Sequence, residues 1–198
     1  MTDPTWQDHE FTDLDWYARD LSNETYRDCA FRDVDLTESV SRGATFESCA
    51  FANCRFNASR HVGSAFVACD FQRTSFFGAS LEGCKMTGSI FVRCTLRPIT
   101  VRGGQWRSVT MRGASLTKLD LAGLSLREAD LSDSDLSGAS LHGSDLGRAT
   151  LRNATLRETD LRGASLEGAD LTSVRLYNTR VDMNGAVALA ESFGALVE

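Results

Sequence analysis

Hydrophobic side chains recur every five residues along almost the whole chain. From Phe11 to Val181, every residue whose number ends in 1 or 6 is hydrophobic, except Ser41 and His61. A step of five turns an α-helix by about 140° and moves a strand to its opposite face, so neither element keeps these side chains on one side. The chain therefore turns a corner every five residues, and we call each central hydrophobic position i.

The other positions of the five-residue unit suit a coil with short, straight sides. Position i−2 mostly holds a small residue, such as Cys49, Ala114 or Ala139, beside the large residue at i. Twelve of the sixteen glycines stand at i+2, where a turn needs a permissive backbone. Such a coil stacks into a solenoid.

The segments 129–133 (ADLSD) and 139–143 (ASLHG) resemble the A(D/N)LXX consensus of the pentapeptide repeat family. The resemblance implies an all-β fold, a right-handed quadrilateral parallel β-helix with i and i−2 inside. Thirty-five central positions at four per coil give nearly nine coils, roughly 40 Å at the ~4.8 Å spacing of strands. We predict a β-helix over 1–181 and a capping and dimerisation segment over 182–198.

Composition agrees with a self-sufficient hydrophobic interior. The chain is 42% hydrophobic in strict register, and each buried Leu or Phe contributes roughly 1.5–3 kcal/mol. We expect no cofactor, metal or disulfide to be needed. No apolar run approaches about 18 residues and no signal-like core is present, so we expect a soluble cytoplasmic protein.

The cysteines fall on interior positions. All six stand at i−2: Cys29, Cys49, Cys54, Cys69, Cys84 and Cys94. Cys29, Cys49 and Cys69 are twenty residues apart and would form a ladder, close enough for a disulfide in principle. We interpret all six as small core residues that remain thiols in a reducing compartment.

Catalytic chemistry finds little support in the sequence. His9, His61 and His142 lack the spacing of a nucleophile, metal or phosphate site, so we predict that the protein is not an enzyme. The two breaks in the register, Ser41 and His61, are twenty residues apart and fall on adjacent coils of one side. They could hydrogen-bond inside the coil, and we predict a satisfied or water-filled polar pair in preference to a buried Ser–His nucleophile.

Charge is segregated along the chain. Residues 1–40 carry a net charge of −8, residues 41–119 a net charge of +8, and residues 120–170 a net charge of −5. In the last zone we predict stacked carboxylate columns, formed at i−1 by Asp120, Asp130, Asp135, Asp145, Asp160 and Asp170 and at i+2 by Asp133, Glu128 and Glu158. These columns are either a solvated face or an imitation of a phosphate backbone.

The size of the charge limits the imitation of DNA. About 40 Å of duplex carries on the order of 24 charges, whereas the whole chain has a net charge of −6, so mimicry is local to particular faces. In the basic zone, Arg97, Arg102, Arg107 and Arg112 place one arginine on each side of a coil. We expect salt pairing with acidic neighbours in preference to nucleic-acid binding there.

The register stops after Val181, where a short helix is predicted. Asp182 or Asn184 caps it and Gly194 ends it. Its apolar residues either seal the last coil or form a twofold interface. We predict capping together with homodimerisation through Val187, Leu189, Ala190, Phe193, Leu196 and Val197.

Two segments narrow the resemblance to the quinolone-resistance branch of the family. Residues 94–100 (CTLRPIT), interrupted by proline, and residues 181–188 (VDMNGAVA) resemble the MfpA type. That type implies a C-terminally joined dimer that imitates duplex DNA, binds DNA gyrase and reduces the effect of quinolones. The unbroken register leaves no room for the loops of Qnr relatives. The alternative is a generic interaction scaffold or an immunity protein with another partner.

Overall fold

Parallel ladders with partners twenty residues apart build the whole β-structure. The computed structural model describes residues 5–197 and divides into two compact units, one up to Gln105 and one from Trp106. In the first unit Phe11 pairs with Phe31, and in the second Leu156 pairs with Leu176. Twenty residues are four sides of five, so the predicted right-handed quadrilateral β-helix of about nine coils is confirmed.

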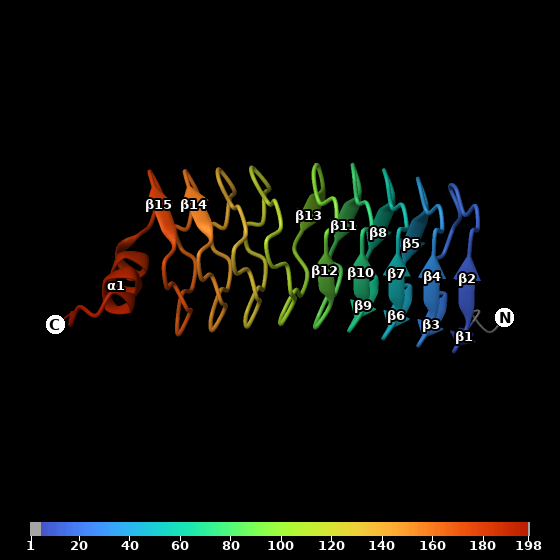
Figure 1. Ribbon diagram of the computed structural model, residues 1–198, viewed down its shortest axis with the longest axis horizontal. Coiled ribbons are helices and arrows are strands. Elements are labelled where there is room, and N and C mark those ends of the chain that lie inside the picture. The colour runs from blue at the N-terminus through green and yellow to red at the C-terminus, as the bar shows by residue number, and fades with distance from the viewer. Residues whose placement is uncertain (1–4, 198) are drawn as a thin grey trace. The chain divides into compact units, whose positions relative to one another are not determined.

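The N-terminal unit holds three parallel sheets, one on each of three sides (Figure 1). The first contains β1 (Thr5–Gln7), β3 (Thr25–Arg27), β6 (Thr45–Glu47) and β9 (Ala65–Val67). The second contains β2 (Glu10–Thr12), β4 (Ala30–Arg32), β7 (Ala50–Ala52), β10 (Asp70–Gln72) and β12 (Ile90–Val92). The third contains β5 (Val40–Arg42), β8 (Arg60–Val62), β11 (Ser80–Glu82) and β13 (Thr100–Arg102). Single bridges from Asp15 through Asp35, Arg55 and Ser75 to Thr95 form the fourth side.

The C-terminal unit has the same coil, held mostly by single parallel bridges. Its strands β14 (Thr155–Arg157) and β15 (Arg175–Tyr177) pair with each other, and the helix α1 (Met183–Ser192) follows them. Asp182 is the N-cap of α1 and accepts a hydrogen bond from the Gly185 N–H, and Gly194 follows with a φ of 86°. The predicted helix and both of its ends are confirmed.

All corners but one share the same backbone conformation at position i+2. From residue 8 to residue 178, each i+2 residue has a positive φ, including twenty-two residues that are not glycine, and Pro98 is the exception. Proline cannot take a positive φ, and at this corner the Arg97–Pro98 peptide is cis. Glycine at i+2 is therefore a preference of the corner, and Asn, Asp and other residues also take its conformation.

The interior positions are i and i−2, as predicted. In the N-terminal unit, rings at i stack from coil to coil: Phe31 on Phe51 at a centroid distance of 4.6 Å, and Tyr26 on Phe46 at 4.8 Å. In the C-terminal unit, leucines occupy the same positions and are almost fully buried from Leu116 to Leu171. Each coil thus covers the apolar side chains of the next.

Polar residues occupy two interior positions near the start of the first unit. The Arg19 guanidinium lies 3.8 Å from the ring centroid of Trp16 and pairs with Glu24 at 3.1 Å. The Tyr26 hydroxyl donates to the Glu24 carboxylate, and burial raises the pKa of Tyr26. The carboxylate is satisfied from both sides, so the break in the pattern leaves none of these three polar side chains without a partner.

Candidate functional site

The predicted acidic residues of the C-terminal unit are distributed over all four sides of the coil. Along one side the order is Asp120, Ser140, Asp160, and along another it is Asp130, Thr150, Asp170. Asp135 lies between Ser115 and Thr155, and Asp145 lies between Ser125 and Ser165. The predicted carboxylate columns are therefore wrong, because hydroxyl residues separate the aspartates on every side.

These aspartates also hold the corners of the coil. An aspartate at i−1 accepts a hydrogen bond from the backbone N–H at i+1, for example Asp120 from Ala122 at 3.1 Å and Asp135 from Ser137 at 3.0 Å. The same bond forms at Asp130, Asp145, Asp160 and Asp170, and in the first unit at Asp15, Asp20 and Asp35. Aspartate favours such turns, so each of these carboxylates has a structural role besides its charge.

Arginines neutralise five of the seven predicted aspartates. Asp160 pairs with Arg162 at 2.6 Å and Asp170 with Arg152 at 2.8 Å. Arg112 lies 3.3 Å from Asp133 and 3.9 Å from Asp130, and Arg127 lies 3.9 Å from Asp145.

Hydrogen-bond donors, charged and neutral, lower the pKa values of three of the seven aspartates. The Arg162 guanidinium lowers the pKa of Asp160. Hydrogen bonds from Thr172, followed by Arg152, lower the pKa of Asp170 to about 2. Hydrogen bonds from Asn153 and then Arg112 lower the pKa of Asp133.

Asp120 and Asp135 are different, because both are exposed and no ion pair within residues 5–197 includes them. Asp135 pairs in its ladder with Ser115, five residues before Asp120, so the two aspartates belong to adjacent sides and neighbouring coils. They are the carboxylates of this set that are open to a cation from another molecule.

The basic residues of the N-terminal unit are mostly unpaired. Of the eight basic residues between 41 and 105, the ion pairs of the described chain include only Arg55, which binds Asp35 at 2.8 Å. The expected salt pairing of the basic zone is therefore wrong for residues 41–105, except at Arg55. In the C-terminal unit it is right for Arg107, which pairs with Glu128 at 2.8 Å, and for Arg112. Residues 41–105 contain only three acids, which is too few to pair with eight bases.

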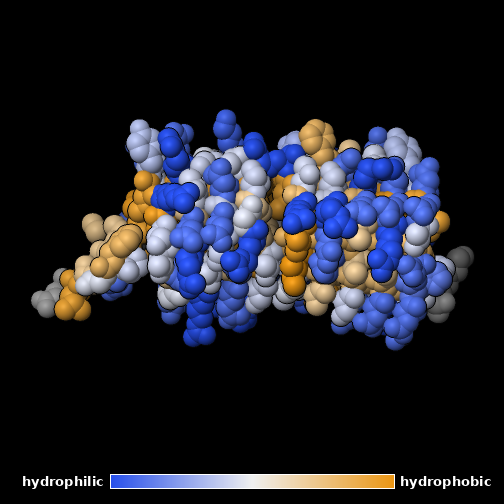
Figure 2. Space-filling view, viewed as in Figure 1, coloured by the Kyte–Doolittle hydropathy of each residue, from blue (hydrophilic) through white to orange (hydrophobic). Residues whose placement is uncertain are grey.

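Apolar side chains of the C-terminal segment face solvent, and Figure 2 shows them gathered over α1. Phe193 is 66% exposed, Leu196 93% and Val197 49%. Val187, Leu189 and Ala190 are half-buried, since they lie on α1 near the coil. Leu176, at a central position of the last coil, is 41% exposed, so α1 does not fully seal the end of the core.

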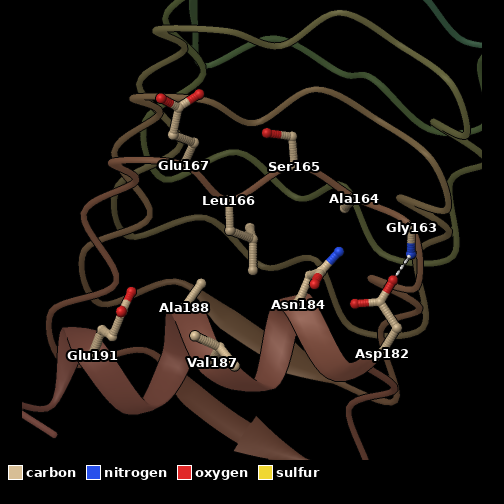
Figure 3. A pocket seen from close by; sticks show the side chains of 10 residues that line it. All are labelled: Gly163, Ala164, Ser165, Leu166, Glu167, Asp182, Asn184, Val187, Ala188 and Glu191. Carbon is tan, nitrogen blue, oxygen red and sulfur yellow. Dashed lines mark hydrogen bonds between the residues drawn. The ribbon is translucent and has the colours of Figure 1, made fainter. Parts of the chain in front are cut away.

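A groove lies between α1 and the coil that contains residues 163–167 (Figure 3). Asp182 holds its two walls together, because its carboxylate accepts from the Gly185 N–H at 2.9 Å and from the Gly163 N–H at 2.7 Å. Leu166 projects from the coil toward α1, where Val187 lines the opposite wall. The segment therefore has an apolar groove next to exposed apolar side chains.

Comparison with known proteins agrees with this architecture. Eight copies of the pentapeptide repeats pattern match residues 63–97, 114–153 and 144–186, which is more than half of the chain. The chain belongs to the pentapeptide repeat family. No curated protein matches its sequence.

Solved structures of one pentapeptide repeat protein share the fold. A trypsin-treated variant of QnrB1, a plasmid-mediated fluoroquinolone resistance protein, is similar with a TM-score of 0.63 and 20% identity, over 99% of this chain and 98% of that one. Full-length QnrB1 is similar with a TM-score of 0.56 and 17% identity, over 96% and 100% of the two chains. At these identities the likeness concerns the fold.

The two exceptions to the pentapeptide repeat register form a closed polar cluster inside the coil. The Ser41 hydroxyl lies 2.7 Å from His61 Nδ1 and 2.8 Å from the Ser64 hydroxyl, and His61 Nε2 lies 3.1 Å from the Ser59 hydroxyl. Burial lowers the pKa of His61 to about 4, so the ring is neutral near pH 7. The predicted hydrogen-bonded pair is confirmed, and its burial keeps substrates away from the serine.

The cysteines occupy the small interior positions of the pentapeptide repeat. Cys94 is half-buried and the other five are buried, and all six are free thiols. Thiols donate to backbone carbonyls, as from Cys54 to Phe31 O at 3.4 Å. Within residues 5–197, His, Cys, Asp and Glu side chains form no group of three that could hold a metal ion. In the same range, every helix is too short or too polar to cross a membrane.

Proposed function

We propose that this pentapeptide repeat protein is a DNA mimic that binds DNA gyrase, modulates its activity and confers resistance to quinolones or similar gyrase poisons. The observation that carries the proposal is the pair of exposed, unpaired carboxylates at Asp120 and Asp135. The fold shared with QnrB1, a fluoroquinolone resistance protein, supports the choice of partner. This function requires the protein to be in the cytoplasm.

Binding by mimicry uses the charge of the carboxylates, so no bond is made or broken. Cationic side chains that bind DNA phosphates would bind Asp120 and Asp135 directly. Asp130, Asp133, Asp145, Asp160 and Asp170 would first have to exchange an arginine of the chain for a gyrase cation. Exposed ion pairs contribute roughly 0–1 kcal/mol, so this exchange costs little and extends the acidic surface.

We further propose that the C-terminal segment joins two copies of the chain. Phe193, Leu196 and Val197 expose apolar surface beside the groove lined by Leu166 and Val187, and a second copy supplies matching apolar side chains. Dimerisation would bring two acidic C-terminal units together. A symmetric acidic surface of this kind suits a twofold enzyme that binds duplex DNA.

The test removes the charges of Asp120 and Asp135 while keeping the turn hydrogen bonds that these side chains accept. In the double variant Asp120→Asn/Asp135→Asn, each amide oxygen still accepts from the backbone N–H two residues later. The variant is titrated in gyrase supercoiling and quinolone-induced DNA cleavage assays at two salt concentrations. We expect the effective concentration to rise about fivefold or more, from roughly 1 kcal/mol of lost charge interactions.

The matched control is Asp15→Asn/Asp20→Asn, which removes the same charge from two residues with the same turn hydrogen bonds in the N-terminal unit. This control should behave as the wild type. Equal potency of both double variants would contradict the mimicry model. No effect of the wild-type protein on gyrase would favour the alternative, an interaction scaffold or immunity protein with another partner.

A further inference from the structure

Phe77 is an aromatic side chain on the outer surface of the N-terminal unit. It is 56% exposed, although its neighbour Phe76 is buried in the core. Its backbone carbonyl accepts from the Ala58 N–H at 2.8 Å, and Ser75 bridges to Thr95 on the next coil. Phe77 therefore lies between Asn57 and Arg97 of the two neighbouring coils, at about 4.8 Å per coil.

Four exposed arginines lie on the same coil as Phe77 or on the coils next to it. Arg73 and Arg93 occupy consecutive corners of one column, with φ values of 49° and 54°, at the other end of the same side. Arg97 follows Phe77 on the next coil, and Arg60 lies on the adjacent side. None of these four takes part in an ion pair of the described residues, and Arg73 donates from Nε to the Asn53 side chain at 2.8 Å.

The side that carries Phe77 has no carboxylate on its own or the next coil. On the preceding side the half-buried Asp70 lies three residues before Arg73 and accepts a hydrogen bond from the Gln72 side chain at 2.9 Å. The outward residues beside Phe77 on its own and the next coil are Ser75, Thr95 and Arg97, and Asn57 lies on the coil before. The nearest acid of this column, Asp35, is already bound to Arg55. An aromatic platform, unpaired guanidinium groups and neutral hydrogen-bonding side chains thus occur together.

We propose that the surface formed by Arg73, Phe77, Arg93 and Arg97 binds single-stranded nucleic acid. An unpaired base stacks on Phe77, and the three guanidinium groups bind backbone phosphates. Single strands are favoured over duplex because duplex bases are already stacked, and readers of duplex DNA place a helix or ribbon in a groove. Arg73 and Phe77 are four residues apart along one side, about 13 Å, so a bound nucleic-acid strand must span this distance to contact both.

This inference is independent of gyrase binding. Asp120 and Asp135 belong to the other unit, and neither is needed for the stacking or phosphate contacts proposed here. Loss of one activity with retention of the other separates the two proposals.

The test is fluorescence anisotropy of the full chain with labelled oligothymidylate and oligouridylate of about 20 nucleotides and with a duplex of equal length. Three phosphate contacts predict a log–log salt slope of about −2, so affinity falls roughly 20-fold between about 50 and 200 mM salt. Tighter binding of either single strand than of the duplex supports the proposal and identifies the preferred sugar. Failure to bind a single strand, or tighter binding of the duplex, overturns it.

Two variants locate the site. Phe77→Ala should weaken binding about fivefold or more through lost stacking, whereas Tyr17→Ala should not. Tyr17 occupies the same position of the same side three coils earlier and is 55% exposed. Arg73→Gln/Arg93→Gln/Arg97→Gln should weaken binding and flatten the salt slope. The control Arg42→Gln/Lys85→Gln/Arg102→Gln removes equal charge from other sides of the same unit.

The controls distinguish a local nucleic-acid site from non-specific attraction to the positive charge of the whole unit. Equal losses in the two triple variants would mean that overall charge accounts for binding. Equal affinities of Phe77→Ala and Tyr17→Ala for the single strand would show that no base stacks on Phe77. Either result overturns the proposal once thermal melts show that the variants fold like the wild type.

Discussion

Replacing His61 with leucine should remove a pH-dependent loss of stability. His61 is fully buried, and burial lowers its pKa from 6.5 to about 4. On the same side, leucine occupies the next central position, Leu81, and also Leu21 two coils before His61, so it fits the repeat. The partners of His61 keep other hydrogen bonds, because Ser41 retains Ser64 and Ser59 donates to Phe56 O at 2.7 Å.

The sign and size of the effect follow from the shift. The unfolded chain binds a proton at His61 below about pH 6.5, but the folded chain does so only below about pH 4. Stability is therefore lost as pH falls through this window, by about 3 kcal/mol at its lower end. Between pH 7.5 and pH 5.5 the wild type should lose about 1.4 kcal/mol from this group. The stability contributed by Asp35 and Asp170, whose pKa values are lowered to about 2, is lost mainly below about pH 4, outside this interval.

The assay is urea unfolding of wild type and His61→Leu at these two pH values, both above the pI of about 5.1. The other ionisable groups are common to both proteins, so the difference between their pH dependences isolates His61. A difference near 1.4 kcal/mol is expected. Identical pH dependence of the two proteins would refute the reasoning, since it would mean that the buried imidazole is protonated as easily as in the unfolded chain.

Two further pairs of substitutions test the backbone at and beside a corner and the C-terminal segment. Gly104→Ala should cost more than about 3 kcal/mol in urea unfolding, because φ is 106° and a Cβ would clash with Cys84 O, whereas Gly103→Ala, with open space and a φ of 59°, should cost about 1 kcal/mol. Similar costs would show that the backbone at 104 can adjust. Phe193→Asp should give a monomer in analytical ultracentrifugation while Val92→Asp, on a 43% exposed residue, leaves the dimer intact; a dimer in both would place the interface elsewhere.

The interior of this protein was predictable because the repeat determines it directly. A five-residue period fixes which side chains point inward, and the twenty-residue spacing of Ser41 and His61 places them in contact. The Asp182 cap and Gly194 were also local signals. The period also places Arg19 and Glu24 at interior i−2 positions, but it could not predict how their charges are compensated there, because this depends on the Trp16 ring and the Tyr26 hydroxyl.

The surface was predicted less well, for two physical reasons. The i−1 aspartates do not form columns because only residues twenty apart are direct neighbours on a side, and Asp120 and Asp160 are forty apart with Ser140 between them. Their turn hydrogen bonds could be predicted from the sequence, because an aspartate at i−1 stands two residues before the i+1 backbone N–H. The ion pairs had none, because pairs such as Arg112 with Asp133 depend on side-chain rotamers across neighbouring coils. The same applies to the arginines near Phe77, which take part in no ion pair of the described residues.

The repeat separates the requirements of folding from those of binding. Positions i, i−2 and i+2 are constrained by the core and the corner, while i+1 and most i−1 positions project outward with little effect on the coil. Within residues 5–197, Asp120 and Asp135 form no ion pair in one unit, and Arg73, Arg93 and Arg97 form none in the other. An unpaired exposed charge costs the folded state little, so stability alone does not select these arrangements. If the two surfaces bind partners of opposite charge, as proposed, the asparagine and glutamine variants should alter binding without altering the melting temperature.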